Sequence, residues 1–243
     1  MTDALTYLGV DGCRAGWFAA GAEEYGGYFL TIYESFQSLW QKHGDAGLIL
    51  VDIPVGLKES GPEERRCDVE ARAVLEHRKS SVFPAPCLQA SQAESYQEAN
   101  RLNKENRGRG LSLQSWHISR KIAEVDSLLY QQPETRKTIR ESHPEIIFWA
   151  LNDRQDMTHN KKTAAGYQER FELLAEFFPQ SRELADRALD KFLRKELARD
   201  DILDALALLY NARQSPENIA AFPAVPEKDP RNIIMEIVYP QPE

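Results

Sequence analysis

The chain has 243 residues, of which 42% are hydrophobic and 9% aromatic, enough for one large domain or two small ones with an ordinary core. Its formal net charge of -8 and pI of about 5.3 exclude nucleic-acid binding through a uniformly basic surface. No apolar run reaches the roughly 18 residues of a membrane helix, and the sequence lacks a signal-peptide pattern, so no membrane partner is expected. Three cysteines without a zinc-ligand spacing are typical of a reducing compartment, and we expect a cytoplasmic protein.

The N-terminal region predicts three short strands in an antiparallel meander. Its apolar, strand-forming runs are separated by glycine-bearing junctions, among them the turn signal Tyr25-Gly26-Gly27. The first run ends at Asp11, which Gly12 follows. The predicted strands cover residues 5–12, 16–23 and 27–35.

A helix and a fourth strand follow the meander. Ser35 is suited to cap the helix, and Gly44 is suited to end it. Residues 48–51 are apolar at every position, as in a strand buried on both faces, and the run ends at Asp52. Because a strand reached through a helix usually runs parallel to the sheet that it rejoins, we expect this strand beside the first one and parallel to it.

Residues 58–135 contain charged stretches with a helical pattern, and they predict a helical insertion within a single domain of residues 1–243. No Gly/Ser-rich or Pro-rich linker separates this region from the rest of the chain. The insertion is expected to hold helices at residues 63–77, 89–104 and 115–131. The remainder predicts a strand at 137–143, a helix that Pro144 opens, helices at 166–178, 182–197 and 200–212, and a final strand at 232–240.

Aspartates at two strand ends are the most informative feature of the sequence. If their strands are parallel neighbours, Asp11 and Asp52 emerge at the carboxyl edge of the sheet, where open α/β sheets place their chemistry. Asp201 and Asp204 are three residues apart, so they share one face of the helix for which Asp200 is the expected N-cap. The topology therefore predicts that four carboxylates converge.

Converging carboxylates predict a metal site. They would repel one another and raise each other's pKa values unless a cation neutralised them. Oxygen ligands without nearby Cys or His favour Mg²⁺ or Mn²⁺ over zinc. Two such ions, about 3.5–4 Å apart, can bind the attacking water and the leaving oxygen of a phosphodiester.

Each aspartate also has a simpler interpretation. An aspartate before Gly or Pro at a strand end is commonly a turn residue, and Asp201 could serve only the helix dipole. Asp3, Asp45 and Asp153 are expected to be surface charges.

The order of the predicted elements resembles the ribonuclease-H-like fold, an α/β fold with a mixed five-stranded sheet flanked by helices. The motifs "GVDG", "VDIP" and "DILDALAL" are similar to the acidic set of bacterial Holliday-junction resolvases. The chain resembles still more closely a family of predicted ribonuclease-H-like nucleases, domain of unknown function 429. The matching stretches span nearly the full length and are "GVDGCRAGW", "VDIPVGL", "RRCDVEAR", "RKSSVFPAP", "EVDSLL", "ESHPE", "NKKTAAGYQER" and "DDILDALAL".

The resemblance implies roles for the acidic residues. The core metal ligands would be Asp11, Asp52 and Asp204, with Asp201 beside them as a further catalytic residue. Related nucleases often carry Glu at the second strand end, where this chain has the shorter Asp52. A fifth carboxylate would come from Glu141, as a catalytic residue, or from Glu145, as a metal ligand.

A basic segment indicates where a substrate could bind. Between Arg101 and Lys121, six Lys or Arg residues oppose one acidic residue, and such a segment could hold phosphates. Trp116 and His117 could stack on a base, although a solvated loop with a core Trp is the simpler alternative. The expected substrate-binding residues are Arg78, Lys79, Arg107, Arg109, Lys121 and Lys162.

These residues favour a nuclease that hydrolyses DNA or RNA at a site of two Mg²⁺ or Mn²⁺ ions. Two alternatives stay open. An ATP-dependent phosphotransferase would need glycine-rich phosphate loops, of which "GVDGCRAGW" is a faint example. A non-catalytic nucleic-acid-binding or regulatory protein could keep the acidic site for a structural ion. The expected partner is a nucleic acid, and the oligomeric state, a homodimer included, stays open.

Overall fold

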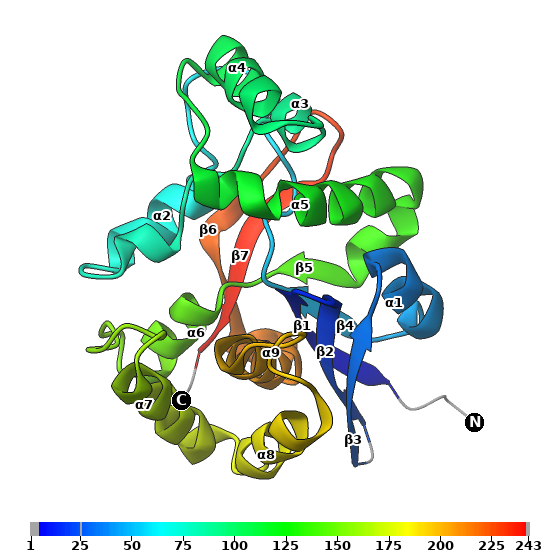
Figure 1. Ribbon diagram of the computed structural model, residues 1–243, viewed down its shortest axis with the longest axis vertical. Coiled ribbons are helices and arrows are strands. Elements are labelled where there is room, and N and C mark those ends of the chain that lie inside the picture. Colours follow the sequence, from blue (N-terminus) through cyan, green and yellow to red (C-terminus); the bar gives the residue numbers. More distant parts are fainter. Residues whose placement is uncertain (1–4, 25, 242–243) are drawn as a thin grey trace. The chain divides into compact units, whose positions relative to one another are not determined.

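The computed structural model describes residues 5–24 and 26–241, so Asp3 and Tyr25 lie outside the described residues (Figure 1). The chain divides into two compact units. The first unit comprises Met1–Asp52, Lys137–Ala220 and Val238–Glu243, and the second comprises Ile53–Arg136 and Ala221–Ile237. The insertion predicted at residues 58–135 falls within the second unit, while the single domain over residues 1–243 stays a prediction.

A mixed five-stranded sheet forms the centre of the first unit and confirms the predicted α/β fold. Its strand order is β3-β2-β1-β4-β5. Strands β1 to β3 form the predicted antiparallel meander, whereas β4 runs parallel to β1 and β5 runs parallel to β4. The strands are β1 (Thr6–Cys13), β2 (Gly16–Glu23), β3 (Gly27–Tyr33), β4 (Leu48–Val51) and β5 (Ile139–Glu141).

The crossover between β3 and β4 is the predicted helix α1 (Phe36–His43). The Ser35 hydroxyl accepts a hydrogen bond from the Ser38 N–H (3.1 Å), and the Ser38 hydroxyl accepts one from the Ser35 N–H (3.3 Å). This reciprocal cap satisfies two backbone donors at the start of the helix. Gly44 ends the helix, as predicted.

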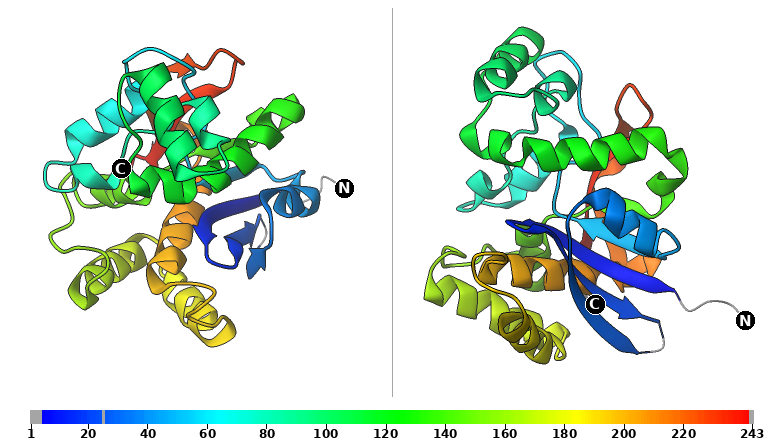
Figure 2. Two further views of the ribbon diagram at one scale, coloured as in Figure 1. Left: turned by 45° about the horizontal axis from the view of Figure 1, so that its top comes forward. Right: turned by 45° about the vertical axis from the view of Figure 1, so that its right-hand side comes forward.

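Helices that follow β5 flank the sheet in the first unit (Figures 1 and 2). Pro144 occupies the first turn of α6, where its missing N–H leaves no bond unmade. Most residues of helix α9 are buried, because its apolar residues pack on strands β1, β2 and β4. The helices are α6 (Pro144–Leu151), α7 (Ala164–Phe177), α8 (Ser181–Lys191) and α9 (Arg199–Ala212).

The second unit is mainly helical and differs from the sequence prediction in one helix. The helix expected at residues 89–104 is two helices, because the Ser95 hydroxyl accepts the Glu98 N–H (3.3 Å) and starts a new helix there. The other two predicted helices are confirmed. The helical segments are α2 (Arg66–Val74), η1 (Lys79–Ser81), α3 (Leu88–Ser91), α4 (Tyr96–Arg107), α5 (Leu113–Gln131) and η2 (Pro133–Lys137).

The C-terminal region forms a two-stranded sheet after the short turn η3 (Pro216–Asn218). The final strand predicted at 232–240 is confirmed as β7 (Ile234–Pro240), but its partner β6 (Ile219–Lys228) was not predicted. Pro223 and Pro226 lie within β6, and prolines argue against a strand because they cannot donate to the ladder. Among the described helices of both units, none has the length and apolar character needed to cross a membrane.

Candidate metal centre

Helix α9 approaches strand β1 so closely that backbone meets backbone. A Cβ atom at Gly9 would lie 2.1 Å from the Ala205 carbonyl oxygen and 2.2 Å from the Leu209 amide nitrogen. Only glycine avoids this clash. Asp204 directly precedes Ala205, and Asp11 lies two residues beyond Gly9 on the same face of β1. The contact at Gly9 therefore brings the two aspartates together.

Strand register brings Asp52 to the same place. Val10 pairs with Val51, and the Asp52 N–H donates to the Val10 carbonyl oxygen (3.1 Å). The next residue on each strand is an aspartate, so Asp11 and Asp52 leave neighbouring parallel strands at the same level and on the same face. The parallel pairing that the sequence predicted for these two strands is confirmed.

The carboxylates of Asp11, Asp52 and Asp204 form one cluster, which we call the acidic cluster. One carboxylate oxygen from each residue lies within 4.8 Å of the others. Asp11 is 8% exposed and Asp204 2% exposed, whereas Asp52 is half-buried and is the most exposed of the three. Residues 5–24 and 26–241 contain no second group of three His, Cys, Asp or Glu side chains at such spacing.

Burial and mutual repulsion both disfavour the ionised forms of the aspartates in and beside the acidic cluster. Burial, followed by the charges of Asp52, Asp204 and Asp201, raises the pKa of Asp11 well above its usual value. Burial and the charge of Asp52 raise the pKa of Asp204 to about 7, although Lys161 opposes the shift. Burial is also the main cause that raises the pKa of Asp201 to about 6. An added cation would stabilise the ionised form of each group.

Lys161 supplies the cation that the structure already contains. Its Nζ lies 2.6 Å from Asp204 Oδ2, and its side chain is mostly buried. Burial alone would lower the pKa of Lys161, but Asp204, Asp52 and Asp11 outweigh that effect and raise the pKa above its usual value. The sequence analysis missed this residue and selected its exposed neighbour Lys162. Nothing in the local pattern distinguishes two adjacent lysines before the fold is known.

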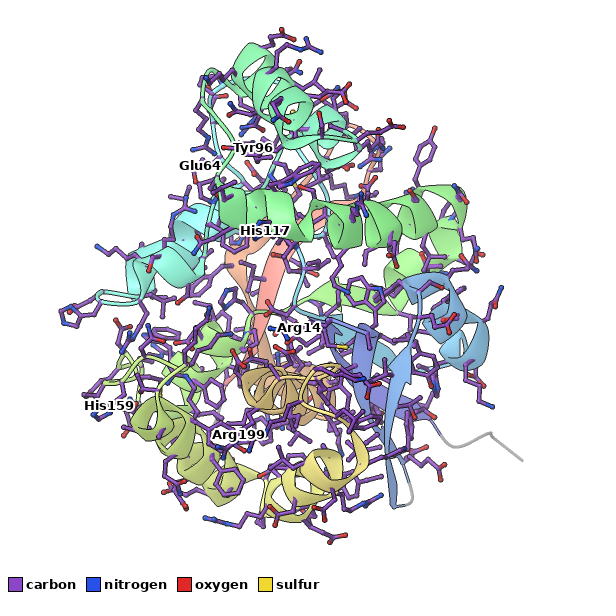
Figure 3. The ribbon with its side chains drawn as sticks, in the orientation of Figure 1. Arg14, Glu64, Tyr96, His117, His159 and Arg199 are labelled. Atoms are coloured by element: carbon purple, nitrogen blue, oxygen red, sulfur yellow. The ribbon has the colours of Figure 1, made fainter. Side chains whose placement is uncertain are left out.

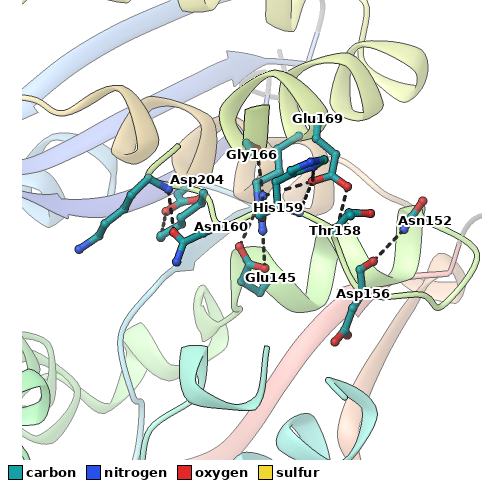
Figure 4. Close-up of polar contacts among 12 residues, drawn as sticks. Glu145, Asn152, Asp156, Thr158, His159, Asn160, Gly166, Glu169 and Asp204 are labelled. Carbon is teal, nitrogen blue, oxygen red and sulfur yellow. Dashed lines mark hydrogen bonds and ion pairs between the residues drawn. The ribbon is translucent and has the colours of Figure 1, made fainter. Parts of the chain in front are cut away.

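The two glutamates expected at the site have other positions. Arg170 Nε donates to Glu145 Oε1 (2.9 Å) and Nη2 donates to Glu145 Oε2 (2.8 Å), so both oxygens of the predicted metal ligand are engaged (Figure 4). Glu141 pairs with Val51 across β5 and β4, which directs its side chain to the opposite face from Asp52. The structure therefore brings neither glutamate into the acidic cluster.

Asp201 lies beside the acidic cluster and also serves the helix. Its carboxylate accepts the Ala198 N–H (3.2 Å) from the third position of α9, a bond that satisfies a free donor at the helix start. The prediction that Asp200 caps the helix is wrong, because Ala198 is the N-cap and Asp200 lies inside the first turn. Asp204 lies one turn further in, as expected. Asp45 and Asp153 are exposed, in agreement with the surface role predicted for them.

The predicted substrate-binding residues are divided between the two units. Arg107 is buried in the second unit, where its guanidinium donates to the Ser60 carbonyl (3.0 Å) and to the Glu63 carbonyl. Arg109 forms an ion pair with Glu64. The others in the second unit are Arg78, Lys79 and Lys121, whereas Lys162 belongs to the first unit.

Trp116 and His117 differ in exposure, although they are neighbours on α5. Trp116 packs against a buried cluster of the second unit that includes Cys87, Ala99 and Leu111. This packing matches the simpler alternative, a core tryptophan. His117 is exposed (Figure 3).

The chemistry of the acidic cluster fits a hard divalent cation. Its donors are carboxylate oxygens alone, which Mg²⁺ and Mn²⁺ prefer. Burial, followed by repulsion from the neighbouring aspartates, raises the pKa values of Asp11 and Asp204 even with Lys161 present, and a bound cation would oppose both shifts. Asp11, Asp52 and Asp204 are the residues that would hold the ion.

Comparison with known proteins gives a family. Neither the comparison with curated proteins nor the comparison with solved structures found a match. One family description, "Protein of unknown function (DUF429)", matches residues 9–228. That range includes Asp11, Asp52, Lys161 and Asp204. Because the match covers most of the sequence, the chain belongs to the DUF429 family.

Proposed function

We propose that the protein is a metal-dependent nuclease, which hydrolyses phosphodiester bonds at the acidic cluster. The observation that carries the proposal is the convergence of Asp11, Asp52 and Asp204 from two parallel strand ends and one helix. Three ionised carboxylates that are buried or half-buried at one point lower the stability of the folded protein unless a cation offsets their repulsion. A function that uses a cation accounts for that cost.

The side chains have separate tasks in this proposal. Bound Mg²⁺ or Mn²⁺ would supply a Lewis acid that polarises a phosphoryl oxygen and lowers the pKa of water. Asp11 and Asp204 hold fixed positions, because the Gly9 contact locks α9 against β1. Lys161 adds a positive charge beside Asp204 that offsets part of the negative charge of the acidic cluster.

Exposed cations of the first unit support a phosphate-bearing substrate. Arg14 lies in the turn that directly follows β1, three residues beyond Asp11 (Figure 3). It is exposed. Lys162 is also exposed and directly follows Lys161. Nucleic acid is therefore the proposed substrate, since its backbone presents phosphates to such cations.

One observation favours a second function. The ion pair between Lys161 and Asp204 partly neutralises the acidic cluster without a metal. A non-catalytic nucleic-acid-binding or regulatory protein could keep the cluster in this state. An ATP-dependent phosphotransferase, the other alternative, would use the same carboxylates with a nucleotide in place of a nucleic acid.

A cleavage assay separates these functions. The purified chain would be incubated with single-stranded DNA, duplex DNA, branched DNA, RNA and an RNA–DNA hybrid, with Mg²⁺, Mn²⁺ or EDTA. We expect cleavage of at least one substrate. EDTA and Asp52→Asn should both abolish this cleavage, whereas Asp45→Asn, the control at an exposed site, should not affect it. Binding without cleavage would support the regulatory function, and phosphoryl transfer from ATP without cleavage would support the phosphotransferase.

A further inference from the structure

Lys161 occupies a place that a second metal ion would need. Metal sites with two ions keep them about 3.5–4 Å apart and share carboxylate oxygens between them. In this protein Asp204 Oδ2 already binds the Lys161 ammonium at 2.6 Å. A divalent ion on the same oxygen would lie against a fixed positive charge. The acidic cluster therefore has room for one ion beside Lys161.

Charge balance leads to the same stoichiometry. Asp11, Asp52 and Asp204 carry three negative charges when ionised. One divalent ion and one ammonium group match these three charges. Asp201 is a fourth carboxylate, but it lies beside the cluster and not in it, and one of its oxygens accepts the Ala198 N–H at the helix start.

The loop that carries Lys161 is anchored on both sides of the lysine. The Glu169 carboxylate accepts the Thr158 N–H (2.7 Å) and the His159 N–H (2.9 Å), and these bonds hold the preceding residues (Figure 4). After the lysine, the Lys162 N–H donates to Asn160 Oδ1 (3.0 Å). Lys161 therefore extends from a fixed backbone, and its contact with Asp204 is not that of a freely moving surface lysine.

A buried ion pair fixes this loop to the rest of the first unit. Arg170 is 2% exposed and donates to the His159 carbonyl (3.0 Å) while it pairs with Glu145 of α6. Gly166 allows α7 to begin directly against the loop, because a Cβ there would lie 2.0 Å from the Asn160 carbonyl oxygen. Glu145 and Arg170 thus position Lys161 through the loop and take no direct part in the acidic cluster.

We propose that Lys161 is the built-in second cation of the acidic cluster, so that the site holds one divalent ion per chain. This inference rests on the proposed function only in assuming that the cluster binds metal. It replaces the site of two ions expected from the sequence with a site of one ion and one lysine. Lys161 is a positioning residue here, because it acts on the ion through the shared carboxylate of Asp204.

The test is the number of Mn²⁺ ions bound by the full chain, measured by calorimetric titration and by the loss of the free Mn²⁺ signal in electron paramagnetic resonance. We expect one ion for the wild type and two for Lys161→Met, which keeps most of the length of the side chain and removes its charge. Lys161→Arg keeps a cation and should bind one ion. Lys162→Met removes the same charge from the same loop and should also bind one ion.

Two ions bound by the wild type, or one ion with unchanged affinity in Lys161→Met, would overturn the inference. If Lys161→Met does not fold, Lys161→Gln takes its place, since it also removes the charge, and one ion bound by Lys161→Gln with unchanged affinity would overturn the inference in the same way. The cleavage assay is scored separately. Cleavage by a wild-type protein that binds two ions would support the proposed function and reject this inference. The expected ion counts without any cleavage would support this inference and reject the proposed function.

Discussion

Gly9 of β1 and Ala205 of α9 meet at a distance that only a glycine permits, with 2.1 Å between the site of an added Cβ and the Ala205 carbonyl oxygen. This contact lies two residues from Asp11 and one residue from Asp204. The smallest residue in the strand therefore determines where two of the three carboxylates stand.

Gly9→Ala should displace α9 and weaken metal binding. The added methyl group meets backbone, which cannot rotate away, so we expect a loss of roughly 1–3 kcal/mol or more in the free energy of unfolding. Gly47→Ala is the matched control, since its Cβ would approach no atom closer than 3.4 Å. Denaturant unfolding and Mn²⁺ titration of both variants provide the measurements. Equal behaviour of the two variants would mean that α9 is less closely packed than described.

Asp204→Asn should reduce cleavage far more than Asp201→Asn. Asp204 lies in the acidic cluster, whereas the Asp201 carboxylate binds the Ala198 N–H and stands beside the cluster. Loss of a group that stabilises the charged transition state costs roughly 10²–10³-fold in rate, and we expect that loss for Asp204→Asn. For Asp201→Asn we expect less than about tenfold, since it removes no direct ligand. Single-turnover rates at saturating Mg²⁺ measure the two losses. Small and equal losses would mean that both residues only stabilise helix α9.

Stability without metal should fall as the pH rises from 5 to 8. The pKa of Asp204 is about 7 in the folded protein against 3.8 for an ordinary aspartate, so the folded state binds more protons between these values. The free energy of unfolding decreases with pH wherever the folded state binds more protons than the unfolded state. Each kcal/mol lost lowers the Tm by roughly 2–4 °C in a protein of this size.

Thermal scans with EDTA at several pH values would measure this dependence. Asp204→Asn should flatten it, because the amide does not titrate, and Asp45→Asn should leave it unchanged. Added Mg²⁺ or Mn²⁺ should restore the Tm at pH 8, since a ligand held only by the folded state stabilises it. A metal-free protein whose Tm rises steadily from pH 5 to 8, with Asp204→Asn behaving the same, would contradict the electrostatic account.

Arg107→Ala should destabilise the protein and leave the salt dependence of nucleic-acid binding unchanged. Its guanidinium is buried and donates to the carbonyls of Ser60 and Glu63, so it is not available to phosphates. We expect a loss of roughly 1.5–3 kcal/mol, as for a hydrogen bond to a charged group. Lys104→Ala, an exposed cation of the same helix, is the control. A flatter slope of log K against log salt for Arg107→Ala alone would restore Arg107 to the substrate-binding residues.

The sequence predicted the parts of the site that follow from strand order. Asp11 and Asp52 could be placed together because a helical crossover makes their strands parallel, and the observed register pairs the residues directly before them, Val10 and Val51. Asp204 followed from helical spacing. Lys161 and the Arg170–Glu145 pair could not be predicted, because they depend on how a loop packs on α7 and α6. Strand β6 was missed because Pro223 and Pro226 are poor strand residues in any local pattern.

The central claim is that Asp11, Asp52 and Asp204 together bind a divalent ion. Crystals grown with Mn²⁺ would test it directly through the anomalous signal of manganese. We expect one peak between these three carboxylates, with Mn–oxygen distances of about 2.0–2.3 Å, and no peak at that position in Asp52→Asn. A wild-type crystal in which manganese is absent from the acidic cluster, with Lys161 still bound to Asp204, would contradict the account.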